Sequence, residues 1–251
     1  TRNLVAGLLV LIFNHIFCNL GELSSQWKKA YIVPIYKGKG DNMNKDNYRG
    51  LSILESFYKI FVAILLVRLD RFCERCGIRS VSQCGFRSKL GTSIACFTLL
   101  HCIIATCSGR DVGGRGGVLF VCFIDFRKAY DSVCRQLLWK RLRELGIGGN
   151  MLRILQDIYM DTKFKVKMNK RISEGYVITV SGVRQGCPLS PLLFGIFIEQ
   201  LRLFLQTHLP EIKVLVIDEA DLCEVLFADD LGIMAYCAKD MNKLCSALHK
   251  F

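Results

Sequence analysis

The sequence of 251 residues predicts an α+β fold, with helices packed against strands that carry acidic side chains. Three observations support this prediction. Long apolar stretches with helical spacing alternate with short runs rich in β-branched and aromatic residues. Charged residues make up 22% of the chain and apolar residues 51%, which is typical of a folded domain and not of a disordered chain. The chain also contains no internal repeat.

The first hundred residues are predicted to be mainly helical. Residues 4–20 are expected to form a helix that Gly21 ends, and their uninterrupted apolar run is shorter than the roughly 20 residues that a membrane span requires. We therefore expect this helix to be buried. A strand over residues 30–36 leads into a polar loop, and further helices are predicted over residues 52–73 and 92–107.

The middle of the chain begins with a glycine-rich segment. Residues 109–117 predict a flexible loop and a boundary between subdomains. Residues 118–126 are short and rich in β-formers, as in a buried strand. Asp131 is expected to cap a helix that runs to Leu145 and that Gly146 ends.

The last third of the chain is predicted to mix strands and helix. Residues 163–168 alternate lysine with apolar residues, which indicates a half-exposed strand. Residues 188–205 predict a helix. Residues 213–235 predict strands around a turn at Asp229 and Asp230.

The net charge of +12 is unevenly distributed. Residues 27–89 contain 13 Lys/Arg against 5 Asp/Glu, and residues 127–171 contain 12 against 4. Residues 199–230 reverse the sign, with 8 acidic residues against 2 basic ones. Two basic blocks around an acidic one suit a protein that binds a polyanion and holds metal cations at one place. A well-solvated basic surface explains the charge equally well.

The 13 cysteines are odd in number and scattered. Many lie inside apolar runs, as Cys102 and Cys187 do, where a free thiol packs as a small hydrophobe. This usage suits a reduced intracellular compartment, the nucleus or the cytoplasm. Cys73 and Cys76 have metal-type spacing with Cys84 as a third ligand, but no His follows at a zinc-finger interval. Whether this set binds a metal stays open.

Three acidic residues stand out as candidates for chemistry. Asp125 ends a predicted buried strand, and Asp229 and Asp230 are adjacent between two apolar segments. Adjacent carboxylates at the tip of a hairpin repel each other unless a cation neutralises them. A third carboxylate from a neighbouring strand would complete an oxygen-rich Mg²⁺ site. An Asp pair alone is a weak signal, because Asp favours turns in any case.

The segments around these carboxylates resemble the palm motifs of reverse transcriptases. Residues 123–131 (FIDFRKAYD) resemble the first palm motif, residues 182–191 (GVRQGCPLSP) the second, and residues 227–230 (FADD) the third.

Segments upstream resemble the other blocks of the same family. Residues 27–41 and 47–52 are similar to the two fingers motifs, and residues 82–87 with Gly91 and Thr92 to the segment that separates them from the palm. The resemblance covers roughly residues 27–236, with its blocks in the family's order. It is greatest to the LINE-like group of non-LTR retrotransposons.

This resemblance implies the fingers and palm of a right-hand polymerase, with a ferredoxin-like palm sheet. Residues 1–115 would be fingers with an N-terminal helix, and residues 116–251 the palm, with 133–180 partly fingers. The chain is expected to be a fragment that stops before the thumb and lacks the other domains of the parent polyprotein.

The resemblance also assigns catalytic roles. Asp125, Asp229 and Asp230 would be the catalytic metal ligands, with the carbonyl of Phe126 in addition, and the metal would be Mg²⁺ or Mn²⁺. Tyr130 matches the steric gate that excludes a 2′-hydroxyl. The alternative for Tyr130 is a core aromatic beside the start of a helix.

Five further residues would bind the nucleotide. Gln185 and Gly186 would line its pocket, where glycine lets the backbone approach the substrate. Lys37 or Lys39, with Arg49, would hold the triphosphate. The alternatives are loop residues that only aid solubility for the two lysines, and a surface ion pair for the arginine.

Two local features qualify the resemblance. Gly50 follows Arg49 where the family usually has proline, which is expected to loosen the loop without removing the charge. Residues 218–221 spell the DEAD string of RNA helicases, but that chemistry requires a phosphate loop of the form GxxxxGK[ST], which the sequence lacks. We interpret the string as chance.

The expected function is RNA-directed DNA synthesis, by two-metal phosphoryl transfer from a dNTP to a primer 3′-hydroxyl. The expected partners are an RNA template, a DNA primer and dNTPs, and no membrane. Two alternatives stay open: an RNA-templated RNA polymerase, and a decayed or domesticated relic that only binds nucleic acid. The intact carboxylates and Tyr130 argue mildly against decay.

Overall fold

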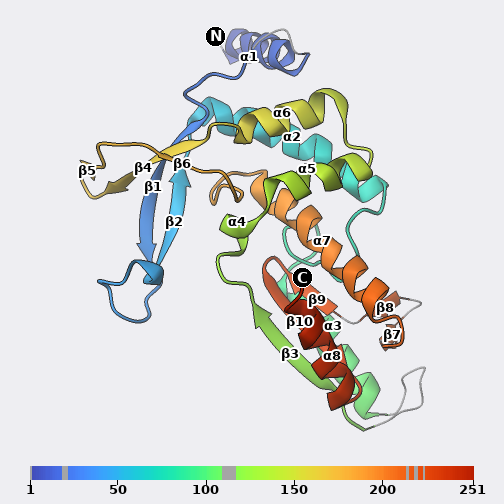
Figure 1. Cartoon of the computed structure of the whole chain (residues 1–251). Coiled ribbons are helices and arrows are strands. Elements are labelled where there is room, and N and C mark those ends of the chain that lie inside the picture. Colours follow the sequence, from blue (N-terminus) through green and yellow to red (C-terminus); the bar gives the residue numbers. More distant parts are fainter. Residues whose placement is uncertain (1, 19–21, 109–116, 213–214, 218–219, 223) are drawn as a thin grey trace. The chain divides into compact units, whose positions relative to one another are not determined.

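The chain divides into two compact units that interleave along the sequence. The computed structural model (Figure 1) describes residues 2–18, 22–108, 117–212, 215–217, 220–222 and 224–251. Unit 1 comprises Thr1–Phe72 and Tyr130–Leu193, and unit 2 comprises Cys73–Ala129 and Phe194–Phe251.

A single boundary at residue 115 does not describe this division, because unit 2 continues to Ala129. The assignment of residues 1–115 to fingers and 116–251 to palm stays a prediction. The predicted glycine-rich loop, apart from Gly117, lies outside the described residues.

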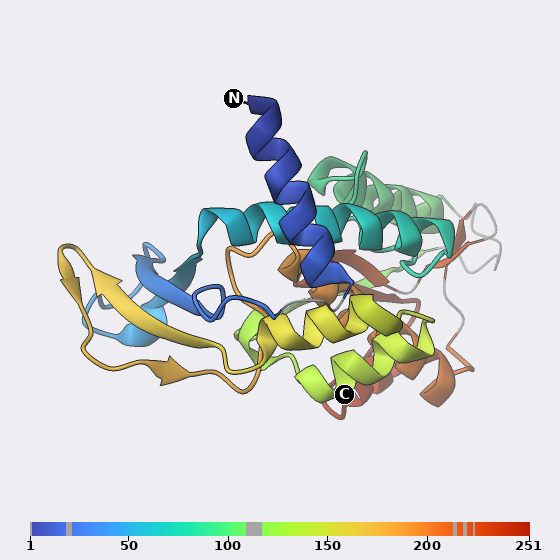
Figure 2. The same ribbon diagram turned by 90° about the horizontal axis from the view of Figure 1, so that it is seen from above.

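Unit 1 is built around a five-stranded sheet with the order β2-β1-β4-β5, in which β6 also pairs with β4. Strand β1 is antiparallel to β2 and parallel to β4. Figure 2 shows α5 and α6 side by side, with the β4–β5 hairpin extending beyond them. The elements are α1 (Arg2–Phe17), β1 (Lys29–Tyr36), a short 3-10 helix (Lys45–Asn47), β2 (Tyr48–Ile53), the start of α2 (Ser56–Arg75), most of α4 (Ala129–Ser132), α5 (Arg135–Glu144), α6 (Gly149–Tyr159), β4 (Lys163–Met168), β5 (Arg171–Ile172), β6 (Val177–Ile178) and the start of α7 (Ser190–His208).

The predicted helix over residues 52–73 begins later, at Ser56. Ser52 and Ile53 belong instead to β2, whose backbone pairs with β1 along its whole length. A carboxylate then starts the helix, because Glu55 Oε2 accepts a hydrogen bond from the Tyr58 amide at 2.8 Å. The strands predicted over residues 30–36 and 163–168 are confirmed as β1 and β4.

The single helix predicted from Asp131 to Leu145 is in fact two helices, and Asp131 lies inside the first of them. The break has a hydrogen-bonding cause. The carbonyls of Tyr130 and Val133 accept the amides of Val183 and Gly182, both at 2.8 Å. These carbonyls are therefore not available to continue a helical ladder. The predicted C-terminus is confirmed, with Gly146 at φ +80°.

Unit 2 contains an antiparallel sheet with the order β3-β10-β9. Helix α3 packs against the face that carries Val225 and Met234, and α8 lies against β10 and β3 on the opposite face (Figure 1). The core on the α3 side includes Cys102, so this thiol packs as predicted. The elements are the end of α2, α3 (Thr92–Cys107), β3 (Phe120–Asp125), the end of α7, β7 (Leu215–Ile217), β8 (Ala220–Leu222), β9 (Glu224–Phe227), β10 (Asp230–Ala235) and α8 (Ala238–Leu248).

The DEAD string falls on the hairpin of β7 and β8. Val216 pairs with Asp221 across this hairpin. Residues 218 and 219 lie outside the described residues. Helix α3 has the predicted bounds, and the helix predicted over residues 188–205 is confirmed as α7.

Helix α1 forms as predicted, but the expectation that it is buried is wrong. Only its last turns pack: the Phe13 ring lies 5.2 Å from Phe61 and 6.4 Å from Trp27 between centroids. Leu4 and Leu11 are exposed. No described helix is both long enough and apolar enough to cross a membrane.

Replacing Phe13 with Ala should loosen α1, because Phe13 and Ile16 are the two buried side chains among the described residues of that helix. We expect a loss of about 3 kcal/mol of unfolding free energy and faster proteolysis within α1, measured by chemical denaturation and limited proteolysis. Leu11→Ala, at a residue that is 69% exposed, is the matched control and should change neither. Equal destabilisation by both variants would show that α1 packs through a different face.

Candidate active site

The pairing of β3 with β10 places two carboxylates opposite each other. Asp125, the last residue of β3, is the cross-strand partner of Asp230, the first residue of β10. Directly opposed residues project from the same face with Cβ atoms about 5 Å apart. Both side chains are exposed at this end of the sheet. Asp125 was expected to lie close to Asp229 and Asp230, and the strand register places it opposite Asp230.

The third carboxylate lies in the turn that joins β9 to β10. Phe227 pairs with Asp230, so Ala228 and Asp229 form a two-residue turn, one residue earlier than predicted. Ala228 has φ +60°, a conformation that residues with a Cβ rarely adopt. Asp229 is half-buried. The turn is thus tight, and its geometry depends on whatever packs against Ala228.

The segment that packs there is residues 82–87, which resemble the motif between fingers and palm. The Leu226 amide donates to the Ser82 carbonyl at 2.9 Å, and the Cys84 amide donates to the Leu226 carbonyl at 2.8 Å. A Cβ on Gly85 would lie 2.1 Å from the Ala228 backbone nitrogen. Only glycine allows this approach, so Gly85 sets the position of the Asp229 turn.

Polar side chains hold this segment at both ends, and those at the Ser82 end are buried. The Ser82 hydroxyl donates to Glu224 Oε1 at 3.1 Å, and Glu224 is fully buried, with Arg202 Nε at 3.7 Å. At the other end Arg87 forms two hydrogen bonds to Glu74, which lower the pKa of that carboxyl. Buried polar groups that are fully paired favour a single arrangement of the backbone.

A groove of about 370 Å³ opens beside the carboxylate pair. One wall is α3 and the other is the face of the sheet that carries Asp125 and Asp230. Phe123 lies on this wall and is 73% exposed. The groove thus joins an apolar surface to the carboxylates. Its lining residues are Thr92, Ala95, Cys96, Leu99, Phe123, Ile124, Asp125, Val225, Phe227, Asp230, Leu231 and Gly232.

The carboxylate oxygens of Asp125 and Asp230 are suitable ligands for a hard divalent cation. Mg²⁺ is commonly bound through one or two carboxylates plus substrate phosphates and water, which the opposed Asp125 and Asp230 can supply. Among the described residues, no group of three His, Cys, Asp or Glu side chains is gathered closely enough to hold a metal ion. Asp125 and Asp230 are therefore opposed, but Asp229 does not form a group of three carboxylates with them. The predicted roles of Asp229 and the Phe126 carbonyl as metal ligands stay predictions.

The cysteines with metal-type spacing do not form a site in the described part of the chain. Cys73 and Cys84 are buried and Cys76 is exposed. Burial raises the pKa of the Cys84 thiol, which disfavours the thiolate that binds metals.

The residues predicted to bind the nucleotide all lie in unit 1. Lys37 begins the loop between β1 and β2, and its Nζ donates to the Asp46 carbonyl at 2.8 Å. The loop is held by the tilted rings of Tyr36 and Tyr48, whose centroids are 5.4 Å apart, and by the hydrogen bond that the Tyr48 hydroxyl donates to the Asn42 carbonyl. Lys39 is exposed at the tip of this loop.

Arg49 is exposed on β2, opposite Ile35 of β1. The expectation that Gly50 loosens a loop here is wrong, because Gly50 lies within β2 and pairs with Pro34. A Cβ at this position would lie 3.0 Å from the Ile32 Cγ2. Gly50 therefore permits close packing between strands.

Tyr130 is half-buried on α4, directly beside the second palm motif. Its carbonyl accepts the Val183 amide at 2.8 Å. Gly182 has φ +78°, and a Cβ there would lie 2.8 Å from the Cα of Asp131. The first and second palm motifs thus approach each other backbone to backbone, and glycine is required at the crossing.

Gln185 and Gly186 lie along the edge of β2. The Gln185 carbonyl accepts the Ser52 amide at 2.9 Å. Gly186 has φ +97°, and a Cβ there would lie 2.8 Å from the Ser52 carbonyl oxygen. The loop that carries the predicted nucleotide-binding Gln185 is therefore fixed to the strand that carries Arg49.

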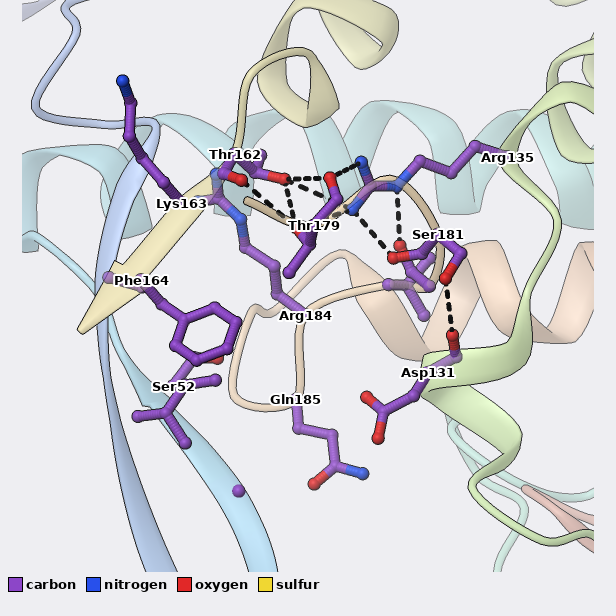
Figure 3. Close-up of a pocket in the computed structure, with 15 residues that line it drawn as sticks. Ser52, Asp131, Arg135, Thr162, Lys163, Phe164, Thr179, Ser181, Arg184 and Gln185 are labelled. Carbon is purple, nitrogen blue, oxygen red and sulfur yellow. Dashed lines mark hydrogen bonds between the residues drawn. The ribbon is translucent and has the colours of Figure 1, made fainter. Parts of the chain in front are cut away.

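Arg135 organises this region, a role that no motif or pattern in the sequence indicated. Its guanidinium donates to the carbonyls of Tyr159 at 2.8 Å, Thr179 and Gly182 at 2.9 Å, and Ser181 at 3.0 Å. Figure 3 shows this cluster, with the Gln185 side chain pointing away from it. Burial lowers the pKa of Arg135, but a guanidinium keeps its charge in proteins.

Arg184, inside the second palm motif, is also structural. It is buried, donates to the carbonyls of Trp27 at 3.0 Å and Ile158 at 3.2 Å, and lies 5.4 Å from the Tyr58 ring centroid. In the sequence, only the place of Arg184 within the motif, between an apolar residue and Gln185, could have indicated this structural role.

Comparison with known proteins gives the family. Residues 35–251 match the family described as "Reverse transcriptase (RNA-dependent DNA polymerase)". The chain belongs to this family. The predicted resemblance to the reverse transcriptases of non-LTR retrotransposons is thereby confirmed.

The relatives of this reverse transcriptase include proteins of mobile elements. The chain is 26% identical to the "RNA-directed DNA polymerase from mobile element jockey" of Drosophila melanogaster over 90% of its own length and 23% of that protein. It is 29% identical to a "Retrovirus-related Pol polyprotein from type-1 retrotransposable element R2" of Nasonia vitripennis, over 89% of the chain and 20% of that protein. The chain thus spans under a quarter of these two relatives.

A solved structure supports the fold. Telomerase from Candida albicans, in complex with a fragment of telomeric RNA, aligns with a TM-score of 0.61 at 12% identity, over 91% of the chain and 40% of the telomerase. The α+β reverse transcriptase fold is therefore confirmed.

Replacing Gly85 with Ala should displace the Asp229 turn, because the new Cβ would overlap the Ala228 backbone. We expect amide hydrogen exchange at Cys84 and Leu226 to accelerate at least about tenfold and Mn²⁺ binding to weaken. The control is Gly91→Ala, where a Cβ meets nothing within 4 Å. Unchanged exchange in the Gly85 variant would show that the turn is held by other contacts.

Proposed function

We propose that this chain is the part of an RNA-directed DNA polymerase that holds the catalytic carboxylates and the incoming dNTP. The observation that carries the proposal is the register of β3 and β10, which sets Asp125 opposite Asp230 in a chain of the reverse transcriptase family. Opposed carboxylates at an exposed sheet end have no structural role in the core, whereas cation binding accounts for them.

Asp125 and Asp230 would hold divalent cations, preferably Mg²⁺ and alternatively Mn²⁺. Such ions supply charge neutralisation at the transferring phosphoryl group and make the primer 3′-hydroxyl more acidic. Asp229 is adjacent and would complete the ligand set, with the Phe126 carbonyl. The apolar groove beside Phe123 would receive the sugar and base of the primer end.

In unit 1 the side chains would bind and select the nucleotide. Lys37 or Lys39, with Arg49, would hold the triphosphate, and Tyr130 would exclude the 2′-hydroxyl. Gln185 and Gly186 would line the pocket, since Gly186 is exposed and has no side chain to keep a ligand from its backbone. The Arg135 cluster would keep this loop in place.

The partners in this proposal are an RNA template and a DNA primer, and the place of action is intracellular, in the nucleus or the cytoplasm. The printed names of the relatives, RNA-directed DNA polymerases of mobile elements, support the choice of RNA and DNA. An RNA polymerase or a non-catalytic relic would retain the same fold, so activity measurements must separate them.

The substitution Asp229→Asn should abolish Mg²⁺-dependent dNTP incorporation while nucleic-acid binding stays within about twofold. Removal of a metal ligand costs several kcal/mol of transition-state stabilisation, or more than about a hundredfold in rate, whereas binding depends on dispersed Lys and Arg. Primer extension measures dNTP incorporation, and fluorescence anisotropy measures nucleic-acid binding. Asp161→Asn, in an exposed turn, is the control of equal charge. Retention of activity in the Asp229 variant would contradict the assignment.

The substitution Tyr130→Ala should raise the use of rNTPs relative to dNTPs, because a smaller side chain leaves room for a 2′-hydroxyl. The measured quantity is the ratio of kcat/KM for the two substrates. Tyr130→Phe keeps the ring and should leave the ratio unchanged. If Tyr130→Ala also leaves the ratio unchanged, Tyr130 is a packing residue of α4.

A further inference from the structure

Two cysteines meet on the face of the unit 2 sheet that lies opposite the carboxylates. Cys122 of β3 is the cross-strand partner of Ile233, which is fully buried, and directly opposed residues project from the same face. Asp125, three residues along the same strand, projects from the other face because side chains alternate. Cys122 therefore lies on the side of the sheet that α8 covers (Figure 1).

Helix α8 brings Cys245 to the same place. The buried side chains of this helix are Met241, Leu244 and Ala247, which mark the face that packs on β10 and β3. Cys245 follows Leu244 directly and lies one helical turn after Met241, so it borders this packed face. It is half-buried, as Cys122 is.

The two thiols are in contact. Cys122 and Cys245 are hydrogen-bonded through their side chains, and neither is in a disulfide. Burial, and then the neighbouring Cys122 thiol, raise the pKa of the Cys245 thiol, which is the mutual effect of two acidic groups at one place. A strand and a helix from separate segments of unit 2 thus present paired thiols to each other.

Packing as small hydrophobes does not account for this pair. Cys84 and Cys102 are structural cysteines of the same unit, and both are buried in the core on the α3 side. Cys122 and Cys245 instead keep part of their surface open to solvent, which gives a small oxidant a route to them. Contact between two accessible thiols is the condition for forming a disulfide.

We propose that Cys122 and Cys245 are a site of reversible oxidation, at which hydrogen peroxide converts the two thiols into a disulfide that fastens α8 to β3. One thiolate attacks the peroxide, the O–O bond breaks, and a sulfenic acid forms. The hydroxide that leaves takes up the proton that the thiol lost and becomes water. The second sulfur then attacks the sulfenic sulfur, so the S–S bond forms and a second water leaves. The two thiols lose two electrons, and the peroxide gains them.

The bond would act on the stability of the helix and not on the chemistry of the carboxylates. Cys122 and Cys245 are far apart in sequence, and cross-links that close long loops restrict the unfolded chain most. Helix α8 would then no longer open separately from β3. An excess of small thiols reverses the bond by exchange, so in a reducing compartment it forms only while peroxide is present.

The first test detects the bond in the unmutated chain, by tryptic digestion without reductant after treatment with hydrogen peroxide. Trypsin releases Cys122 in residues 116–127 and Cys245 in residues 244–250, and each peptide contains a single cysteine. We expect the two peptides to be linked, to separate with dithiothreitol, and to stay unlinked in Cys245→Ser. Cys237→Ser, at the start of the same helix, is the matched control and should link normally.

A mixture of isotope-labelled and unlabelled chains distinguishes a bond within one chain from a bond between chains. The proposal requires that linked peptides carry the same label. Cys96, an exposed cysteine of α3, reports that the oxidant has acted. Linked peptides with mixed labels would overturn the proposal, and so would oxidation of Cys96 while the two peptides stay unlinked.

The second test measures the effect of the bond on α8. Amides of α8 should exchange hydrogen at least about tenfold more slowly in the oxidised chain than in the reduced one. Peroxide should not slow this exchange in Cys245→Ala, which keeps every methionine, so methionine oxidation would affect both chains equally. Unchanged exchange in a chain whose two peptides are linked would contradict the fastening of α8 to β3.

Discussion

The register between β3 and β10 is the constraint on which the carboxylate site depends. Leu231 and Ile233 of β10 are fully buried on one face, while Asp230 lies on the other. A slip of one residue would move these apolar side chains away from the α8 side and turn Asp230 into the core. The core thus fixes the register, and the register brings together two like charges that would otherwise separate. Burial on the α8 side of the sheet is what stabilises the arrangement on the opposite side.

In unit 1, contacts between main-chain segments hold the candidate nucleotide-binding residues in place. The second palm motif crosses α4 at Gly182 and touches β2 at Gly186, in both places at distances that a Cβ would not allow. Close crossings of this kind leave several carbonyls facing inward, and unpaired carbonyls are costly when buried. Arg135 and Arg184 supply the missing donors, each from one side chain to several carbonyls. A planar guanidinium with five N–H donors is suited to this, and lysine is not.

Periodicity and turn chemistry predicted the long elements, because these are encoded locally. Helix α3 and strand β4 have the predicted bounds, and β1 differs by one residue. Helix α6 was missed because Gly148 caps it without a side chain and Gly149 follows at positive φ. The division between α4 and α5 was missed because its cause lies in Gly182 and Val183, far along the chain. Similarly, the motifs named the candidate site residues, but they did not indicate that Gly85 and Arg135 hold the segments around those candidates in place, since the partners of Gly85 and Arg135 are remote in sequence.

The interleaving of the two units has a consequence for how the chain folds during synthesis. Strand β1 can pair with β2 soon after synthesis, yet its other edge waits for β4, which follows only after the whole first segment of unit 2. Strand β3 likewise waits for β10 near the end of the chain. Sheets closed by such distant partners form slowly and leave strand edges unpaired in the meantime. Nascent chains of this protein should therefore depend on chaperones that shield the open edge of β1, and β3, until β4 and β10 are made.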